Sequence, residues 1–183
     1  MKKLFSTNPA NVYGLVARLA LGIVVFPHGA QKLLGWFGGY GFDGTMGFLT
    51  GGAHLPWIVA LSVILIEFFG ALFLVFGFAT RLAALGIIGN FLGVVLLSHL
   101  HNGFFMNWNM QAGKGEGLEY FILLFALAIV SFIAGGGKAS IDSYLSDSRL
   151  KSNNGKEIKS DEKKTIHTNI NRRSNRYDNV SSI

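Results

Sequence analysis

The chain has 183 residues, of which 50% are hydrophobic and only 14% are charged, a balance that is unusual for a soluble domain of this length. It contains no cysteine, which excludes disulfides, thiolate metal sites and CxxC redox centres within these residues. Of the net charge of +6, residues 1–137 carry +2 and residues 138–183 carry +4. Positive charge beside apolar stretches indicates contact with an anionic lipid leaflet rather than with nucleic acid.

Four stretches are long and apolar enough to cross the roughly 30 Å hydrocarbon core of a bilayer as helices. They run from about residue 12 to 34, 56 to 78, 82 to 100 and 118 to 134. The sequence therefore predicts an all-α protein, an integral membrane four-helix bundle over residues 1–142. Residues 143–183 are rich in Ser, Asn and Lys and lack apolar periodicity, so we expect them to form a disordered, basic tail.

Basic residues predict the orientation of the spans, because Lys and Arg accumulate on the cytoplasmic side of a membrane. Lys2 and Lys3 precede the first span, Arg81 lies between the second and third, and the tail is basic. The segments 35–55 and 101–117 contain only Lys114 as a cation and are rich in Gly and aromatic residues. Both termini are therefore predicted to be cytoplasmic.

The third span contains a row of small residues, Gly86, Gly89 and Gly93, spaced three and four apart. Small residues on one helix face allow helix backbones to approach closely in lipid. We expect this face to pack against a neighbouring helix.

Charged residues inside the membrane are costly, by about 2.5–3.5 kcal/mol each on insertion scales, and so indicate a partner or a function. At 1.5 Å per residue, Glu67 lies about 16 Å from the start of its span, near the midplane. Asn90 has a similar depth. The long side chain of Arg18, in the first span, reaches toward this level. The sequence predicts a structural ion pair between Arg18 and Glu67.

A second polar group is predicted near the outer ends of the spans, where His28 and Lys32 share a face of the first helix. His99 closes the third span and Glu119 opens the fourth. These four side chains are candidate catalytic residues of an outward-facing pocket, since acid, base and histidine together suit proton or quinone chemistry. The alternative is that they neutralise one another and hold the bundle together. The predicted rim of the pocket consists of Trp36, Trp57 and Trp108.

A metal site is not expected here. His99 and His101 are two apart on a helix and so point in nearly opposite directions, and no further ligands are spaced with them.

Residues 15–142 resemble the DoxX family of small four-helix bacterial membrane proteins. The resemblance rests on Arg18, His28-Gly29-x-x-Lys32, Gly35-Trp36-Phe37, Glu67 with Gly70, Gly77-x-x-Thr80-Arg81, His99, Glu119 and the closing Gly135-Gly136-Gly137-x-x-Ser140-x-Asp142. The family often has proline where this chain has Gly136. The resemblance implies the bacterial inner (plasma) membrane and a membrane subunit of a quinone-linked oxidoreductase, such as a thiosulfate:quinone oxidoreductase. It does not reach beyond Asp142.

Three functions follow from these patterns. In the first, His28, His99 and Glu119 exchange protons with a quinone, Lys32 stabilises negative charge, and electrons come from a soluble or membrane-bound oxidoreductase partner; no cofactor is bound covalently. In the second, the chain is a non-catalytic scaffold that recruits soluble partners through its loops and tail. In the third, it is a carrier for a small molecule, which four helices without an evident inverted repeat make least favoured. The sequence leaves open the substrate, the partner and whether the chain forms a homo-oligomer.

Overall fold

The computed structural model describes residues 7–148, and within them the chain forms helices and loops without a strand. Contacts divide the chain into two units, Met1–Tyr144 and Leu145–Ile183. In the second unit only residues 145–148 are described, and they are helical. Within the predicted tail, residues 143–148 are therefore helical, and the remainder lies outside the described residues. The architecture below is that of the first unit.

The four predicted spans correspond to four helical segments, three of which are long and apolar enough to cross a membrane. The second and third segments continue through π-helical turns. The elements of the four segments are α1 (Val12–Leu34), then α3 (Trp57–Leu65) with η3 (Ile66–Gly70) and α4 (Ala71–Phe76), then α5 (Thr80–Val94) with η4 (Val95–His99), and finally the shorter apolar α6 (Glu119–Ala134). The predicted all-α membrane fold is confirmed, with bounds that differ by a few residues.

Local sequence signals explain where these helices begin and end. The side chain of Asn11 accepts a hydrogen bond from the Gly14 N–H at 3.1 Å and so caps the start of α1. Gly35 ends α1 and Gly77 ends α4, each with a left-handed backbone (φ 73° and 64°) that favours glycine. Three short elements lie between the first and second spans: η1 (Trp36–Gly38), α2 (Gly41–Gly47) and η2 (Phe48–Gly52).

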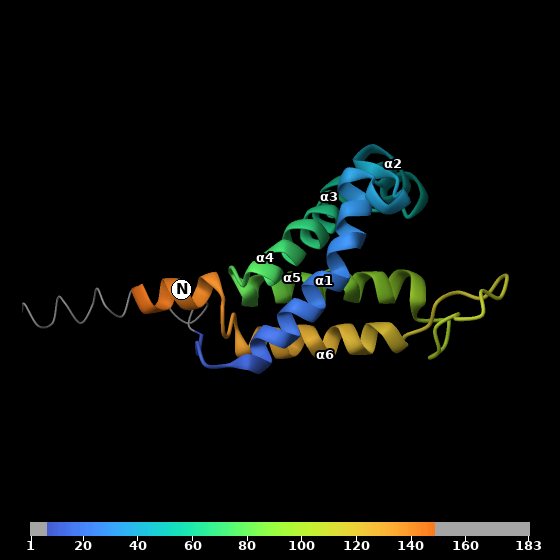
Figure 1. Cartoon of the computed structure of the whole chain (residues 1–183). Helices are drawn as coiled ribbons and strands as arrows, with labels where there is room; N and C mark the ends of the chain where they lie inside the picture. Colours follow the sequence, from blue (N-terminus) through green and yellow to red (C-terminus); the bar gives the residue numbers. More distant parts are fainter. Residues whose placement is uncertain (1–6, 149–183) are drawn as a thin grey trace, which may run out of the picture. The chain divides into compact units, whose positions relative to one another are not determined.

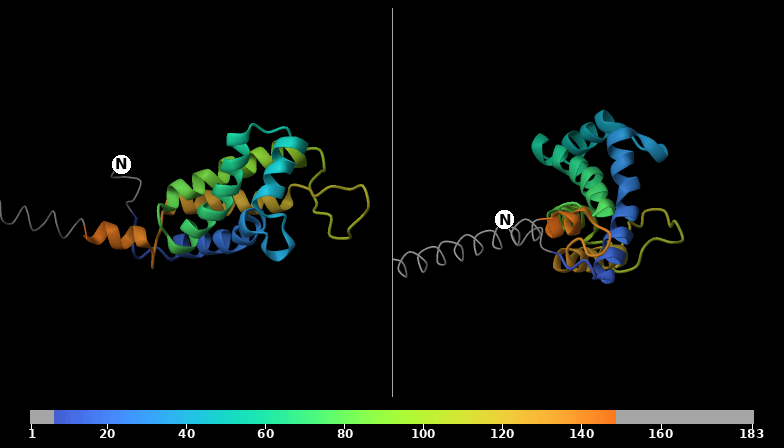
Figure 2. Two further views of the ribbon diagram at one scale, coloured as in Figure 1. Left: turned by 90° about the horizontal axis from the view of Figure 1, so that it is seen from above. Right: turned by 60° about the vertical axis from the view of Figure 1, so that its left-hand side comes forward.

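The spans pack so that α1 contacts α4, η3 and α6, while α5 contacts α6 and η3 (Figure 1). In the left view of Figure 2 the 101–118 loop lies at one end of α5 and α6, and the turn between α4 and α5 lies at the other. We call the first end, which also carries residues 35–56, the loop side. The second end is the terminal side.

Glycines in α1, rather than those in the third span, allow the closest helix approach. A Cβ on Gly29 would lie 2.5 Å from the backbone N of Phe68, and one on Gly22 would lie 2.9 Å from the carbonyl O of Ala71. By contrast, apart from the neighbouring residues and backbone of its own helix, no atom of the described chain lies within 4 Å of a Cβ placed on Gly89 or Gly93. The expected packing face of the third span is thus left open at these two positions.

The interior is layered along the helices. A loop-side polar layer contains Lys32, Glu67 and Asn90, and a terminal-side polar layer contains Arg18, Thr80 and Asp142. Between them lies an apolar layer to which all four spans contribute buried side chains. Its members are Leu21, Val25, Ala71, Ala84, Ile87, Leu124 and Ala128.

Candidate functional site

Glu67 is the centre of the loop-side polar layer. Its side chain is fully buried (0% exposed) and pairs with Lys32, whose Nζ donates to Oε2. Its other carboxylate oxygen, Oε1, accepts a hydrogen bond from Asn90 Nδ2 at 2.9 Å. Three helical segments, α1, η3 and α5, therefore meet at one carboxylate.

The backbone explains why these three side chains meet. Gly29 has no side chain, so α1 lies directly against the peptide between Glu67 and Phe68. Lys32 follows Gly29 by one helical turn and is placed beside Glu67 on the same face. Glu67 itself lies in the π-helical turn η3, and π-helical turns within α-helices are frequent at functional sites.

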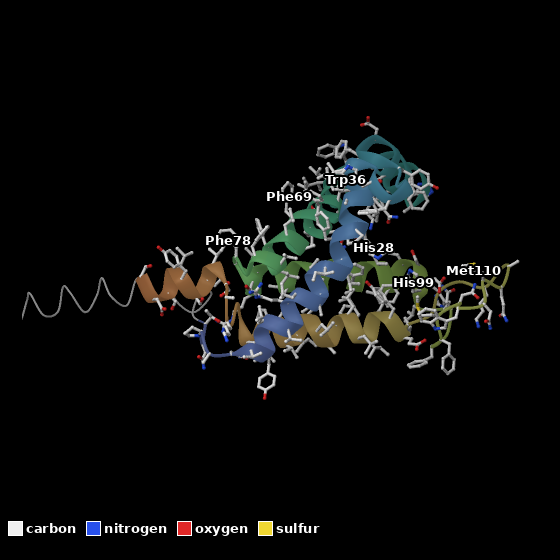
Figure 3. All side chains as sticks on the ribbon, in the orientation of Figure 1. His28, Trp36, Phe69, Phe78, His99 and Met110 are labelled. Atoms are coloured by element: carbon white, nitrogen blue, oxygen red, sulfur yellow. The ribbon has the colours of Figure 1, made fainter. Side chains whose placement is uncertain are left out.

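Two further polar groups lie around Glu67. His28, next to Gly29 on α1, interacts electrostatically with both Lys32 and Glu67. Tyr120, from the first turn of α6, interacts electrostatically with Glu67, and its buried hydroxyl has no hydrogen-bond partner among the described residues. Figure 3 labels His28 on α1, which is drawn across α5 in this view.

A cavity of about 290 Å³ lies on the loop side of this cluster. Lys32 belongs to both, because its side chain lines the cavity, retains 29% exposure and pairs with the buried Glu67. Most of the other wall comes from the segment between the first and second spans. The cavity is lined by Gln31, Lys32, Gly38, Gly39, Tyr40, Thr45, Phe48 and Leu49.

The structure divides the four candidate catalytic residues into two groups. His28 and Lys32 lie beside Glu67, as described above. His99 instead bonds through Nδ1 to the carbonyl O of Glu116 at 2.9 Å, and Glu119 Oε2 accepts a hydrogen bond from the Met106 N–H at 3.2 Å. Both hold the 101–118 loop, and neither lines the cavity. A catalytic role of any of the four stays a prediction.

The three tryptophans of the predicted rim are exposed, but none of them lines the cavity. Trp36 lies in η1 and Trp57 begins α3, while Trp108 lies in the 101–118 loop. Residues 7–148 contain no group of three or more His, Asp or Glu side chains arranged to hold a metal ion.

The predicted ion pair between Arg18 and Glu67 is wrong, because each residue has other partners. Gly29 contacts Glu67, and Arg18 precedes Gly29 by eleven residues, or about 16 Å along the helix. The separation is too large for a side chain to bridge. Counting residues from each helix end misjudged the relative heights, since the helices are inclined to one another (Figure 1).

Arg18 instead joins the second span to residues 135–142 on the terminal side, which we call the closing loop although its last two residues are helical. Its buried guanidinium donates hydrogen bonds to five carbonyl oxygens. The acceptors belong to Leu74, Val75, Gly136, Lys138 and Ala139. Nearby, Asp142 accepts from the backbone N–H groups of Ala79 and Thr80 at 2.8 and 2.9 Å, so the closing loop also caps α5. This cluster has a structural role.

Sequence reasoning missed the contributions of Thr45 and Tyr120. Tyr120 directly follows Glu119 at the start of an apolar helix, and this position alone indicates that its hydroxyl could be buried. Thr45 lies in a polar, glycine-rich segment whose fold carries no periodic signal. Asn90 was placed at the correct depth, but its bond to Glu67 depends on helix rotation that depth does not give.

Comparison with known proteins agrees with this architecture. Residues 14–100 match the model of the DoxX family, and the helices of this range are long and apolar enough for an integral membrane protein. The matched range includes Lys32, Glu67 and Asn90 but ends before α6. The chain is 31% identical over 86 residues to "Inner membrane protein YphA" of Escherichia coli (strain K12). That alignment covers 46% of this chain and 57% of the relative, little more than half its length. No solved structure matches.

Proposed function

We propose that this DoxX-like membrane protein is the quinone-reactive membrane subunit of an oxidoreductase, and that the cluster of Lys32, Glu67 and Asn90 is its reactive site. The observation that carries the proposal is a fully buried carboxylate whose cationic partner also lines a cavity. Ionisable residues within a membrane span are expensive and usually mark a functional site.

The cluster has the groups that reduction of a quinone requires. The overall reaction consumes two electrons and two protons, and turns two carbonyl oxygens into hydroxyls. Lys32 is the donor nearest to the cavity, and Glu67 behind it is positioned to return a proton to Lys32 or to take one from it. His28 is near both groups and offers a second proton-exchanging side chain.

Electrons have to come from a partner protein in this proposal. Without cysteine the chain offers no thiolate ligands for an iron–sulfur cluster. The partner is thus an oxidoreductase, soluble or membrane-bound, that carries its own redox centre. The name of the E. coli relative supports the inner membrane as the location, and the basic residues near both ends support cytoplasmic termini.

The test is quinone reduction by membranes that contain the chain with its co-purifying partners. Replacing Glu67 by Gln keeps the shape and the bond to Asn90 but removes the charge that holds Lys32. We expect the rate to fall by about 10²- to 10⁴-fold, the usual contribution of general acid–base catalysis. Glu116→Gln is the matched control, because Glu116 is an exposed glutamate that bonds to the loop backbone.

An unchanged rate in Glu67→Gln, in protein that is folded and bound to its partner, would refute the proposed site. A rate that falls equally in Glu116→Gln would show that the assay reports loop integrity instead.

A scaffold function has one specific observation in its favour. Arg18, Lys32 and Glu67 all have partners inside the protein, as expected of charges whose only role is to hold helices together. In that case exchanging Lys32 and Glu67 together would preserve partner binding, whereas deletion of residues 149–183 would abolish it. The measurement is whether the partner co-purifies with each variant. A scaffold keeps its partner in the exchange variant and loses it in the deletion variant.

A further inference from the structure

We propose that the loop-side cavity binds the head group of a neutral, planar carbonyl compound, the chemical class to which quinones belong, and that the hydroxyl of Thr45 positions it. This inference rests on the proposed function and adds the binding site and the orienting residue. Thr45 lies in α2, outside the four spans.

Thr45 is the observation that points to a ligand. The residue is only 6% exposed, yet its side chain lines the cavity. Its hydroxyl makes no hydrogen bond to any other part of residues 7–148. A threonine hydroxyl in a helix can donate to the carbonyl one turn earlier, as Thr50 does to the Met46 carbonyl at 2.8 Å. The Thr45 hydroxyl has no such bond among the described residues, so it is available to donate to a ligand in the cavity.

The charge balance of the cavity favours a neutral ligand. Lys32 lines the wall, but Glu67 already neutralises its charge. Among residues 7–148, no second cationic side chain and no carboxylate lines the cavity. A carbonyl oxygen can accept hydrogen bonds from the Thr45 hydroxyl and the Lys32 ammonium without displacing a full charge, whereas an anion would compete with Glu67.

The size and walls of the cavity favour a single ring. A volume of about 290 Å³ lies just below the range of about 300–1,000 Å³ for small-molecule pockets. Phe48, Leu49 and the ring of Tyr40 supply apolar and aromatic surface, and a Cβ on Gly38 would meet open space, which leaves room for a flat group. A long hydrocarbon tail does not fit inside and has to extend into the lipid.

The site can be tested with decylubiquinone, a short-tailed quinone, and the full-length protein in lipid nanodiscs. Trp57 and Trp108 are replaced by Phe, so that quenching of Trp36 reports binding; Trp36 is two residues from the cavity wall at Gly38. Thr45→Val removes the hydroxyl at nearly constant volume. Because a single hydrogen bond is lost, we expect affinity to fall about three- to tenfold. Thr45→Ser is expected to stay within about twofold of the parent.

Thr50→Val is the matched control, since Thr50 lies in the neighbouring turn but does not line the cavity. Equal affinities for Thr45→Val and its parent would overturn the assigned site and leave the proposed function standing if membranes still reduce quinone. An equal loss in Thr50→Val would also overturn it, because the effect would then come from loosening of the segment. If decylubiquinone does not quench Trp36 fluorescence in the parent protein, the cavity assignment is overturned. The proposed function is then tested separately by measuring quinone reduction with Glu67→Gln.

Discussion

The close approach of α1 to η3 predicts a large effect from one methyl group. In Gly29→Ala the added Cβ would lie 2.5–2.6 Å from the backbone atoms of Glu67 and Phe68. Overpacking costs about 1–3 kcal/mol, and the upper end applies because a backbone cannot rotate aside as a side chain can. Because alanine has a better helix propensity than glycine, the substitution also stabilises the fold by about 1 kcal/mol. The expected net loss of folding free energy is about 2 kcal/mol.

Gly89→Ala is the matched control. It makes the same change in a helix where a Cβ meets open space, so only the propensity gain of up to about 1 kcal/mol applies. The measurement is unfolding by sodium dodecyl sulfate in mixed micelles, followed by far-UV circular dichroism and tryptophan fluorescence. Gly29→Ala as stable as the wild type would refute the close approach. Equal losses in both variants would mean that Gly89 packs against another molecule.

Three further changes test the polar layers. Arg18→Met leaves buried carbonyls without a donor, and we expect it to destabilise the protein by about 1–3 kcal/mol for each carbonyl left unpaired, in the same assay; a total loss below about 1 kcal/mol would contradict the role of Arg18. Lys32→Met leaves the buried Glu67 charge without its partner at a cost of about 3–5 kcal/mol, and combining it with Glu67→Gln should recover most of the stability; no recovery would show that the loss is steric. Glu119→Gln should speed limited proteolysis of the 101–118 loop by weakening the bond to Met106, and an unchanged cleavage rate would show that this bond does not hold the loop.

The helices could be predicted from the sequence because hydrocarbon imposes a simple rule. A backbone that crosses lipid has to satisfy its own hydrogen bonds, so length and hydropathy suffice to find α1 and α5. This rule does not apply to the segment between the first and second spans. Its short helices follow from glycine conformations and local contacts, and the cavity they enclose could not be predicted.

The candidate site was only partly predictable for a related reason. Sequence position gives the height of a residue along its own helix, but not the rotation or tilt of that helix against its neighbours. Glu67, Lys32 and Asn90 were recognised as unusual one by one. Their meeting depends on Gly29, whose lack of a side chain brings α1 against η3, and on the π-helical turn that carries Glu67.

The apolar layer between the two polar layers has an electrical consequence. It is the least polarisable part of the bundle, so a potential applied across the membrane drops mainly there. Carrying one charge through the full potential takes about 2.3 kcal/mol per 100 mV, but a proton that reaches Glu67 from the loop side avoids most of that drop. Charge exchanged with the loop-side polar layer would therefore depend on one compartment and respond little to the membrane voltage.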